Sequence, residues 1–257
     1  MRIISLVPSL TETLCDLELQ ENIVGRTKFC VSPKSLHRTV PEIGGTKDPD
    51  IEKIISLKPT HILMNSEENT TLCRKLLREH PKLKDVIFYE SFPKNIQDSI
   101  TMVEDFGNLF SKKNLAMAWK NKIEMLLIQA TQQRSANSNR VLYYVYFIWR
   151  EPWMVAGQNT YIAEMLKLVG YENVIQTGEH MLERYPSLEP TDERLLQADT
   201  LFFSSEPFPF KQRHINEFLA LNKNLLNKKS ILVDGQLLSW YGTRSLQGLE
   251  YLMAGFI

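Results

Sequence analysis

One long segment without proline or glycine, Ser111 to about Gln133, places the strongest constraint on the fold of this chain. Its apolar residues return every three or four positions, which predicts a helix with one apolar face and with Ser111 as its N-cap. The apolar face consists of Leu115, Trp119, Ile123, Leu126, Leu127 and Ala130. Such a helix spans roughly 34 Å, about the width of a small domain. We therefore expect a rigid helix that joins two lobes, with one large domain as the alternative.

Length and composition fit a globular protein of one large domain or two modest ones. The chain has 257 residues, of which 43% are hydrophobic, and its 30 basic residues balance 30 acidic ones. No overall charge therefore favours nucleic acid or an anionic membrane, and no nucleic-acid partner is expected. The cysteines, Cys15, Cys30 and Cys73, are odd in number and form no CxxC pair. This pattern argues against a disulfide framework or a zinc site.

Short apolar strands alternate with helices on both sides of the long segment, which predicts mostly parallel sheets. The pattern occurs twice, because Ile62–Glu67 and Leu201–Glu206 each run from three apolar residues into a polar end in which Ser precedes Glu. An internal duplication favours two lobes over one domain. We predict an α/β fold with two lobes, each a mostly parallel sheet with flanking helices. The expected parts are an N-terminal lobe, 1–110, a connecting helix, 111–134, and a C-terminal lobe, 135–257.

Three passages, RIISLVPSLTETL from Arg2, GGTKDPDIEKIISLKPTHIL from Gly44 and VDGQLLSWYGTRSL from Val233, resemble one family. They are similar to the substrate-binding proteins of ABC importers for cobalamin, ferric siderophores and haem. The resemblance implies a monomeric protein that holds a metal-centred ligand between two lobes and delivers it to the ABC permease in the membrane. A cobalamin-type corrinoid is favoured, with a ferric siderophore or haem as the alternatives. The ligand is cargo, and no covalent cofactor is implied.

The candidate ligand-binding residues follow from the rule that ligands of α/β sheets lie beyond the carboxyl ends of the strands. A large flat ligand such as a corrin or porphyrin also favours aromatic walls with a few polar anchors. In the first half of the chain the candidates are Pro8, Ser9, Phe29, Asn65 and Ser66. In the second half they are Trp149, Trp153, Ser205, Phe208, Phe210, Trp240, Tyr241 and Arg244. Packing in the core is the alternative role for each aromatic residue.

The resemblance also implies docking on the permease through one acidic residue on each lobe. Glu67 and Glu206 occupy equivalent places in the duplicated pattern, and Glu68 is an equal candidate on the first lobe. Ordinary solvated carboxylates are the alternative. The five histidines show no metal-site spacing, so no bare metal ion is expected, although His180 or His214 could supply one axial ligand to a metallated macrocycle.

No catalytic residue is assigned, because the sequence contains no GxSxG, P-loop or GxGxxG motif after a strand. The apolar start, Ile3–Val7, is too short for a signal peptide. The resemblance implies a periplasmic or cell-envelope protein. The cytoplasmic alternative is a carrier or enzyme that handles a metallated cofactor.

Overall fold

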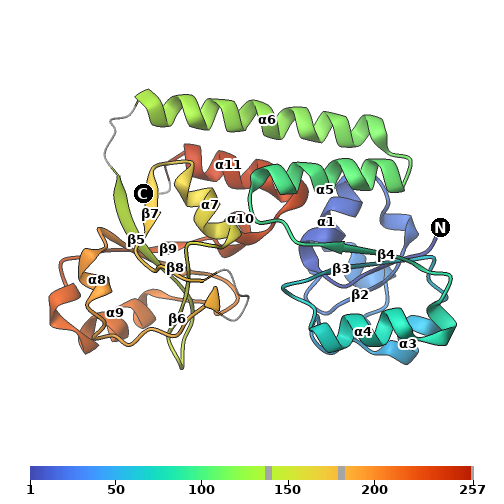
Figure 1. The fold of residues 1–257 in the computed structure, drawn as a ribbon, viewed down its shortest axis with the longest axis horizontal. Coiled ribbons are helices and arrows are strands. Elements are labelled where there is room, and N and C mark those ends of the chain that lie inside the picture. Colours follow the sequence, from blue (N-terminus) through green and yellow to red (C-terminus); the bar gives the residue numbers. More distant parts are fainter. Residues whose placement is uncertain (137–140, 179–182, 256–257) are drawn as a thin grey trace. The chain divides into compact units, whose positions relative to one another are not determined.

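The computed structural model describes residues 1–136, 141–178 and 183–255, and the chain divides into two compact units (Figure 1). Unit 1 contains Met1–Pro93, Gln97–Asn121 and Tyr241–Arg244. Unit 2 contains Lys94–Ile96, Lys122–Trp240 and Ser245–Ile257. The prediction of an α/β fold with two lobes is therefore confirmed. Tyr241–Arg244 comes from the C-terminal part of the sequence but packs in the N-terminal unit, which the sequence did not indicate.

Unit 1 is built on a four-stranded, fully parallel sheet in the order β2-β1-β3-β4. The strands are β1 (Ile3–Ser5), β2 (Ile23–Arg26), β3 (His61–Asn65) and β4 (Ile87–Ser91). The helices are α1 (Pro8–Asp16), α2 (Leu36–Thr39), α3 (Ile51–Ser56), α4 (Thr71–Glu79) and α5 (Ile96–Leu109). Right-handed crossovers in this strand order put α1 on one face and α3 and α4 on the other, as Figure 1 shows.

Unit 2 is built on the strands β5 (Leu142–Trp149), β6 (Met154–Ala156), β7 (Tyr171–Asn173), β8 (Thr200–Ser204) and β9 (Lys229–Val233). Its helices are α7 (Tyr161–Lys167), α8 (Arg194–Gln197), α9 (Gln212–Leu221), α10 (Gly235–Ser239) and α11 (Ser245–Met253). The sheet order is β6-β5-β8-β9, and β7 also pairs with β5. The first half of β5 pairs with β7 in parallel, and its second half pairs with β6 in an antiparallel hairpin. β6, which the sequence pattern did not predict, is the one antiparallel strand among the described residues.

The two units repeat one strand order, because β7-β5-β8-β9 corresponds to β2-β1-β3-β4. The continuous apolar runs in β3 and β8 fit strands that are covered on both faces, and the residues of these runs are fully buried. The shared strand order confirms the internal repeat that the sequence suggested. It also makes the ends of β3 and β8 equivalent positions in the two units.

The long helix α6 (Lys113–Ala136) continues from unit 1 into unit 2. The expected cap was wrong: Ser111 has a positive φ of 58° and lies in the turn before the helix. Ala116 N–H donates to Lys112 O, so the helical hydrogen bonds begin one residue later than expected. The predicted apolar face is confirmed, because Ile123 and Ala130 are buried and the other predicted residues are partly buried. No helix of the described residues is long and apolar enough to cross a membrane.

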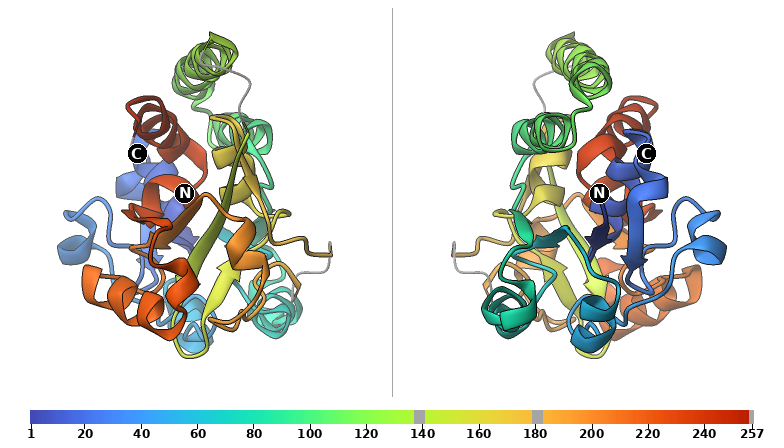
Figure 2. Two further views of the ribbon diagram at one scale, coloured as in Figure 1. Left: turned by 90° about the vertical axis from the view of Figure 1, so that its left-hand side faces the viewer. Right: turned by 90° about the vertical axis from the view of Figure 1, so that its right-hand side faces the viewer.

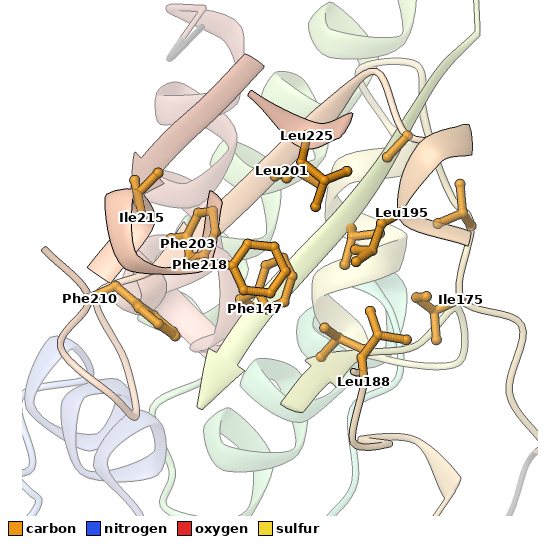
Figure 3. Close-up of a cluster of buried hydrophobic side chains, with 14 residues drawn as sticks. Phe147, Ile175, Leu188, Leu195, Leu201, Phe203, Phe210, Ile215, Phe218 and Leu225 are labelled. Atoms are coloured by element: carbon orange, nitrogen blue, oxygen red, sulfur yellow. The ribbon is translucent and has the colours of Figure 1, made fainter. Parts of the chain in front are cut away.

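An aromatic cluster forms the core under one face of the unit 2 sheet (Figure 3). Phe147 and Phe203, from neighbouring strands, stack with ring centroids 4.7 Å apart and planes 8° apart. Phe218 from α9 meets Phe147 edge-on at 4.6 Å. This cluster fixes the strands whose carboxyl ends carry the candidate site of unit 2. Figure 2 shows the ribbon from the left-hand and the right-hand side of the view in Figure 1.

Candidate functional site

The end of β3 is organised by the side chain of Asn65, which is only 1% exposed. Its Oδ1 accepts hydrogen bonds from the backbone N–H groups of Glu67, at 2.8 Å, and Glu68, at 3.0 Å. Its Nδ2 donates to Ser91 Oγ at the end of β4. Ser66 N–H donates to Ser91 O at 3.0 Å. Asn65 therefore shapes the turn that presents Ser66, Glu67 and Glu68, and its contact with a ligand stays a prediction.

The end of β8 repeats this arrangement with a smaller side chain. Ser204 Oγ accepts from the N–H of Glu206 at 3.2 Å and from the Tyr146 hydroxyl at 3.1 Å. Ser205 N–H donates to Val233 O at 2.9 Å, as Ser66 N–H does to the last residue of β4. Ser205 is exposed, and its hydroxyl also accepts from Gly235 N–H. The two units therefore use the same backbone turn to present a serine followed by a glutamate.

The carboxyl edge of the unit 1 sheet also holds Pro8 and Ser9 at the start of α1, both buried. The Tyr241 phenol lies close to the hydroxyls of Ser9 and Ser91 and is 6% exposed. Burial, and then the charge of Glu68, raise the pKa of Tyr241 well above its ordinary value. The phenol therefore stays protonated and can act as a hydrogen-bond donor at this edge.

The segment around Tyr241 is anchored in unit 1 by specific hydrogen bonds. Gly242 N–H donates to Ser99 Oγ at 2.6 Å, and Thr243 N–H donates to Thr13 Oγ1 at 3.3 Å. Gly242 has a φ of +79°, and a Cβ at this position would lie 2.1 Å from Thr13 Oγ1. Only glycine therefore fits there without strain.

Arg244, a predicted ligand residue, forms a buried ion pair with Glu12 of α1. Its Nε donates to Glu12 Oε2 at 2.7 Å and its Nη2 donates to Oε1 at 2.5 Å. Ser32 Oγ also donates to Oε1. Burial raises the pKa of Glu12, whereas the charge and hydrogen bonds of Arg244 act in the opposite direction. The two donors on this edge of Arg244 are used within the protein, and the pair ties residues that are far apart in the sequence.

Exposed aromatic side chains lie at the carboxyl ends of strands in both units. Phe29, in the loop after β2, is 49% exposed, with Lys28 Nζ 5.2 Å from its ring centre. Trp149, the last residue of β5, is 40% exposed. Phe208, in the loop after β8, is partly buried and meets Trp149 edge-on at 5.8 Å. These three rings have the accessibility that stacking on a ligand requires.

Two other predicted wall residues pack into the unit 2 core. Phe210 is 5% exposed and contacts Phe203 at 5.3 Å between ring centres, as Figure 3 shows. Trp153 is partly buried, lies parallel to Phe210 at 5.9 Å and meets Phe218 edge-on at 4.8 Å. The loops that carry them fold back onto the sheet, so loop position alone did not reveal this packing.

Trp240 and Glu206 form a hydrogen-bonded group in unit 2. Trp240 is 8% exposed, and its Nε1 donates to Glu206 Oε2 at 3.2 Å. Gln236 Nε2 donates to Oε1 of the same carboxylate at 2.6 Å. Glu206 is thus held in one orientation by two neutral donors. No motif marked Gln236 in the sequence, because it lies in α10, a short helix that the sequence pattern did not predict.

The histidine candidates for an axial ligand have different outcomes. His180 lies outside the described residues. His214 is 3% exposed and packs against Phe208 at 5.1 Å between ring centres. Within residues 1–136, 141–178 and 183–255, no group of three or more His, Cys, Asp or Glu side chains could hold a metal ion.

Comparison with solved structures shows the same fold. The periplasmic vitamin B12 binding protein BtuF of Vibrio cholerae superposes with a TM-score of 0.78 at 20% identity, covering 99% of this chain and 96% of BtuF. A periplasmic heme-binding protein from Pseudomonas aeruginosa superposes with a TM-score of 0.81 at 19% identity, covering 99% of this chain and 92% of that protein.

Sequence comparison identifies the family. The high-affinity heme uptake system protein IsdE of Staphylococcus aureus (strain Newman) is 27% identical over 180 residues, which cover 69% of this chain and 59% of IsdE. The matched part is thus less than two thirds of that relative. The model of the family described as "Periplasmic binding protein" matches residues 3–220. Because this match covers most of the sequence, the chain belongs to the periplasmic binding protein family.

Proposed function

We propose that this chain is the substrate-binding protein of an ABC importer and binds a metal-centred ligand. The ligand classes in question are a cobalamin-type corrinoid, haem and a ferric siderophore. Membership of the periplasmic binding protein family supports the proposal. So do the similar proteins, since BtuF is named for vitamin B12 and IsdE for heme uptake. By the same reasoning we propose action in the periplasm or at the cell envelope.

The observation that carries this proposal is the exposure of aromatic rings at the carboxyl ends of the strands. Trp149 and Phe29 are 40% and 49% exposed, although burial of a large aromatic side chain is normally favourable. A flat macrocycle that stacks on these rings recovers the free energy of burial. Phe208 packs edge-on against Trp149 and extends the aromatic surface there.

Polar groups beside these rings fit a ligand with hydrogen-bonding substituents. Ser205 Oγ is exposed at the end of β8. Ser66 Oγ is partly buried and donates to Glu90 Oε1 at 2.6 Å, so this residue offers a lone pair. Tyr241 adds a protonated phenol at the same edge in unit 1. These residues supply orientation, whereas the aromatic rings supply most of the buried area.

We further propose that Glu67 or Glu68 of unit 1 and Glu206 of unit 2 bind basic residues of the permease. All three are partly buried and follow equivalent strands. The fixed carboxylate of Glu206 reduces the entropy that docking costs. A Glu206→Gln variant is expected to keep ligand affinity and lose stimulation of transport by the reconstituted importer. Equal stimulation by this variant and the wild type would remove Glu206 from the docking role.

Tryptophan fluorescence tests ligand binding directly, because one of the four tryptophans lies at the candidate site and another provides a control. Cyanocobalamin, haemin and a ferric siderophore are titrated separately into wild-type protein, Trp149→Ala and Trp119→Phe. Trp119 lies on α6, where its Nε1 donates to Asp16 O. We expect saturable quenching by one ligand, weakened about tenfold in Trp149→Ala and unchanged in Trp119→Phe. The absence of saturable binding for all three ligands would overturn the proposed function.

A further inference from the structure

Arg26 is a buried arginine that the candidate site did not use. It is the last residue of β2, pairs in register with Ser5 at the end of β1, and is 4% exposed. No carboxylate of the described residues forms an ion pair with it, and Glu42, its neighbour across a backbone bridge, is exposed. Burying a guanidinium without a counter-charge costs several kcal/mol. Arg26 therefore calls for an explanation beyond packing.

The hydrogen bonds of Arg26 leave one edge of its guanidinium group unused. Nη1 donates to Thr27 O at 3.1 Å, which fixes the orientation of the group. Nε is buried and has no partner within the protein. Nη2 also has no partner among the described residues, but it is not sealed from solvent. The Nε and Nη2 donors point in the same direction, and together they form the fork that binds both oxygens of a carboxylate.

Two other arginines of this protein show what that fork binds. Arg244 uses Nε and Nη2 to hold Glu12, at 2.7 and 2.5 Å. Arg194 uses Nε and Nη2 to hold Asp192, at 2.9 and 2.7 Å. In both cases the acceptor is a carboxylate of the chain itself. Arg26 has the same fork at the carboxyl end of a strand, where none of the described residues supplies a carboxylate to it.

We propose that Arg26 binds a carboxylate of the ligand through its Nε and Nη2 donors, so that the ligand is a metal complex that carries a carboxylate group. This inference rests on the proposed binding function and narrows it. A porphyrin with propionates or a ferric carboxylate complex meets the requirement. A corrinoid whose side chains are neutral amides, or a ferric hydroxamate, does not.

The test is a binding panel that separates the carboxylate from the metal. The probes are haemin and ferric citrate, which carry carboxylates, and cyanocobalamin and ferrioxamine B, which carry none. Each is titrated into wild-type protein, Arg26→Gln, Arg26→Lys and the control Arg38→Gln, which removes an exposed arginine of α2. We expect a carboxylate probe to bind, with affinity about 10-fold to 100-fold weaker in Arg26→Gln. Arg26→Lys should recover only part of this loss, because lysine lacks the fork, and Arg38→Gln should bind like the wild type.

The outcomes distinguish this inference from the proposed function. Equal affinity of Arg26→Gln and the wild type for a carboxylate probe would overturn the role of Arg26 and leave the function standing. Binding of cyanocobalamin or ferrioxamine B alone would do the same. Binding of no probe would overturn the proposed function, and the inference with it.

Thermal unfolding without ligand provides a second readout for Arg26. A ligand-binding role predicts an equal or higher midpoint for Arg26→Met, because the variant removes a buried unpaired charge. A structural role, or a hidden dependence on Glu42, predicts a lower midpoint for Arg26→Met and for Glu42→Gln. A lower midpoint in both variants would contradict the proposal.

Discussion

The two units share one strand order but differ in the chemistry at the ends of their strands. In unit 1 most groups at the edge are polar, since Asn65, Ser9 and the Tyr241 phenol lie there and Arg26 ends strand β2; the exposed ring of Phe29 is the aromatic addition. In unit 2 the exposed ring at this edge is Trp149, which meets Phe208 edge-on, whereas Trp153 and Phe210 pack in the core below. The backbone turn that follows β3 in unit 1 nevertheless matches the turn that follows β8 in unit 2.

This difference shows that two copies of one scaffold can carry different side chains at equivalent strand ends. The repeated sheet fixes where side chains are presented, and the side chains decide what they bind. Unit 1 presents mostly hydrogen-bonding and charged groups at its strand ends, and unit 2 presents the exposed ring of Trp149. The comparison can be tested with variants that replace one aromatic, charged or polar side chain at a time.

The largest expected effect comes from the aromatic core of unit 2. Phe218→Ala removes a fully buried ring that contacts Phe147, Phe203 and Trp153. The free energy of unfolding should fall by about 3–5 kcal/mol, because a large cavity remains. Urea denaturation followed by circular dichroism measures the loss. A decrease below about 1 kcal/mol would mean that the aromatic cluster does not support this unit.

The next effect concerns the anchored segment of unit 1. Arg244→Ala leaves the Glu12 carboxylate without its partner in a site where the two side chains are 15% and 12% exposed. We expect a loss of about 3 kcal/mol in the free energy of unfolding. Lys120→Ala is the matched control, since its pair with Glu104 is more exposed and should contribute about 1 kcal/mol or less. Equal losses in the two variants would contradict a special role for the buried pair.

A smaller effect should separate the two equivalent turns. Asn65→Ala removes two backbone caps and the bond to Ser91, whereas Ser204→Ala removes one backbone cap and the bond from Tyr146. Asn65→Ala should cost about 2 kcal/mol and Ser204→Ala about 1 kcal/mol. Thermal unfolding of both variants under the same conditions measures which substitution destabilises the protein more. The reverse order would show that the unit 2 turn depends more strongly on its side chain.

The smallest expected signal is the reaction of thiols, which reports on unit 1 alone because Cys15, Cys30 and Cys73 all lie there. Burial, followed by the charge of Asp16, raises the pKa of Cys15 to about 12. At pH 8 roughly one thiol in 10,000 is then ionised, so native protein should react with iodoacetamide far more slowly than free cysteine. The rate should rise with pH. Complete labelling of Cys15 within minutes at pH 8 would contradict this environment.

Most strands and helices could be predicted because they rely on local patterns. Burial can be predicted from apolar runs such as Ile62–Met64 and from the apolar face of the long helix. β6 and α10 were not predicted. β6 has only three residues, and α10 is short and begins with Gly235, so neither shows a clear hydrophobic periodicity. The polar turn after β3 and its equivalent after β8 were recognised from their similar sequences.

The parts of the site that the sequence did not reveal depend on contacts between distant residues. The ion pair of Arg244 was not foreseen, because its partner Glu12 lies at the other end of the sequence. Trp153 and Phe210 pack on each other after their loops fold back. Arg26 had no sequence signal beyond a charge at the end of an apolar strand, and its significance appears only from its burial.

Native mass spectrometry with a mixture of haemin, ferric citrate, cyanocobalamin and ferrioxamine B shows whether this chain binds a metal-centred ligand. We expect one bound ligand per chain, selected from this mixture, with less complex in Trp149→Ala and in Arg26→Gln. Protein that stays ligand-free at a large excess of all four compounds would contradict the claim that this chain is a binding protein for a metal-centred ligand.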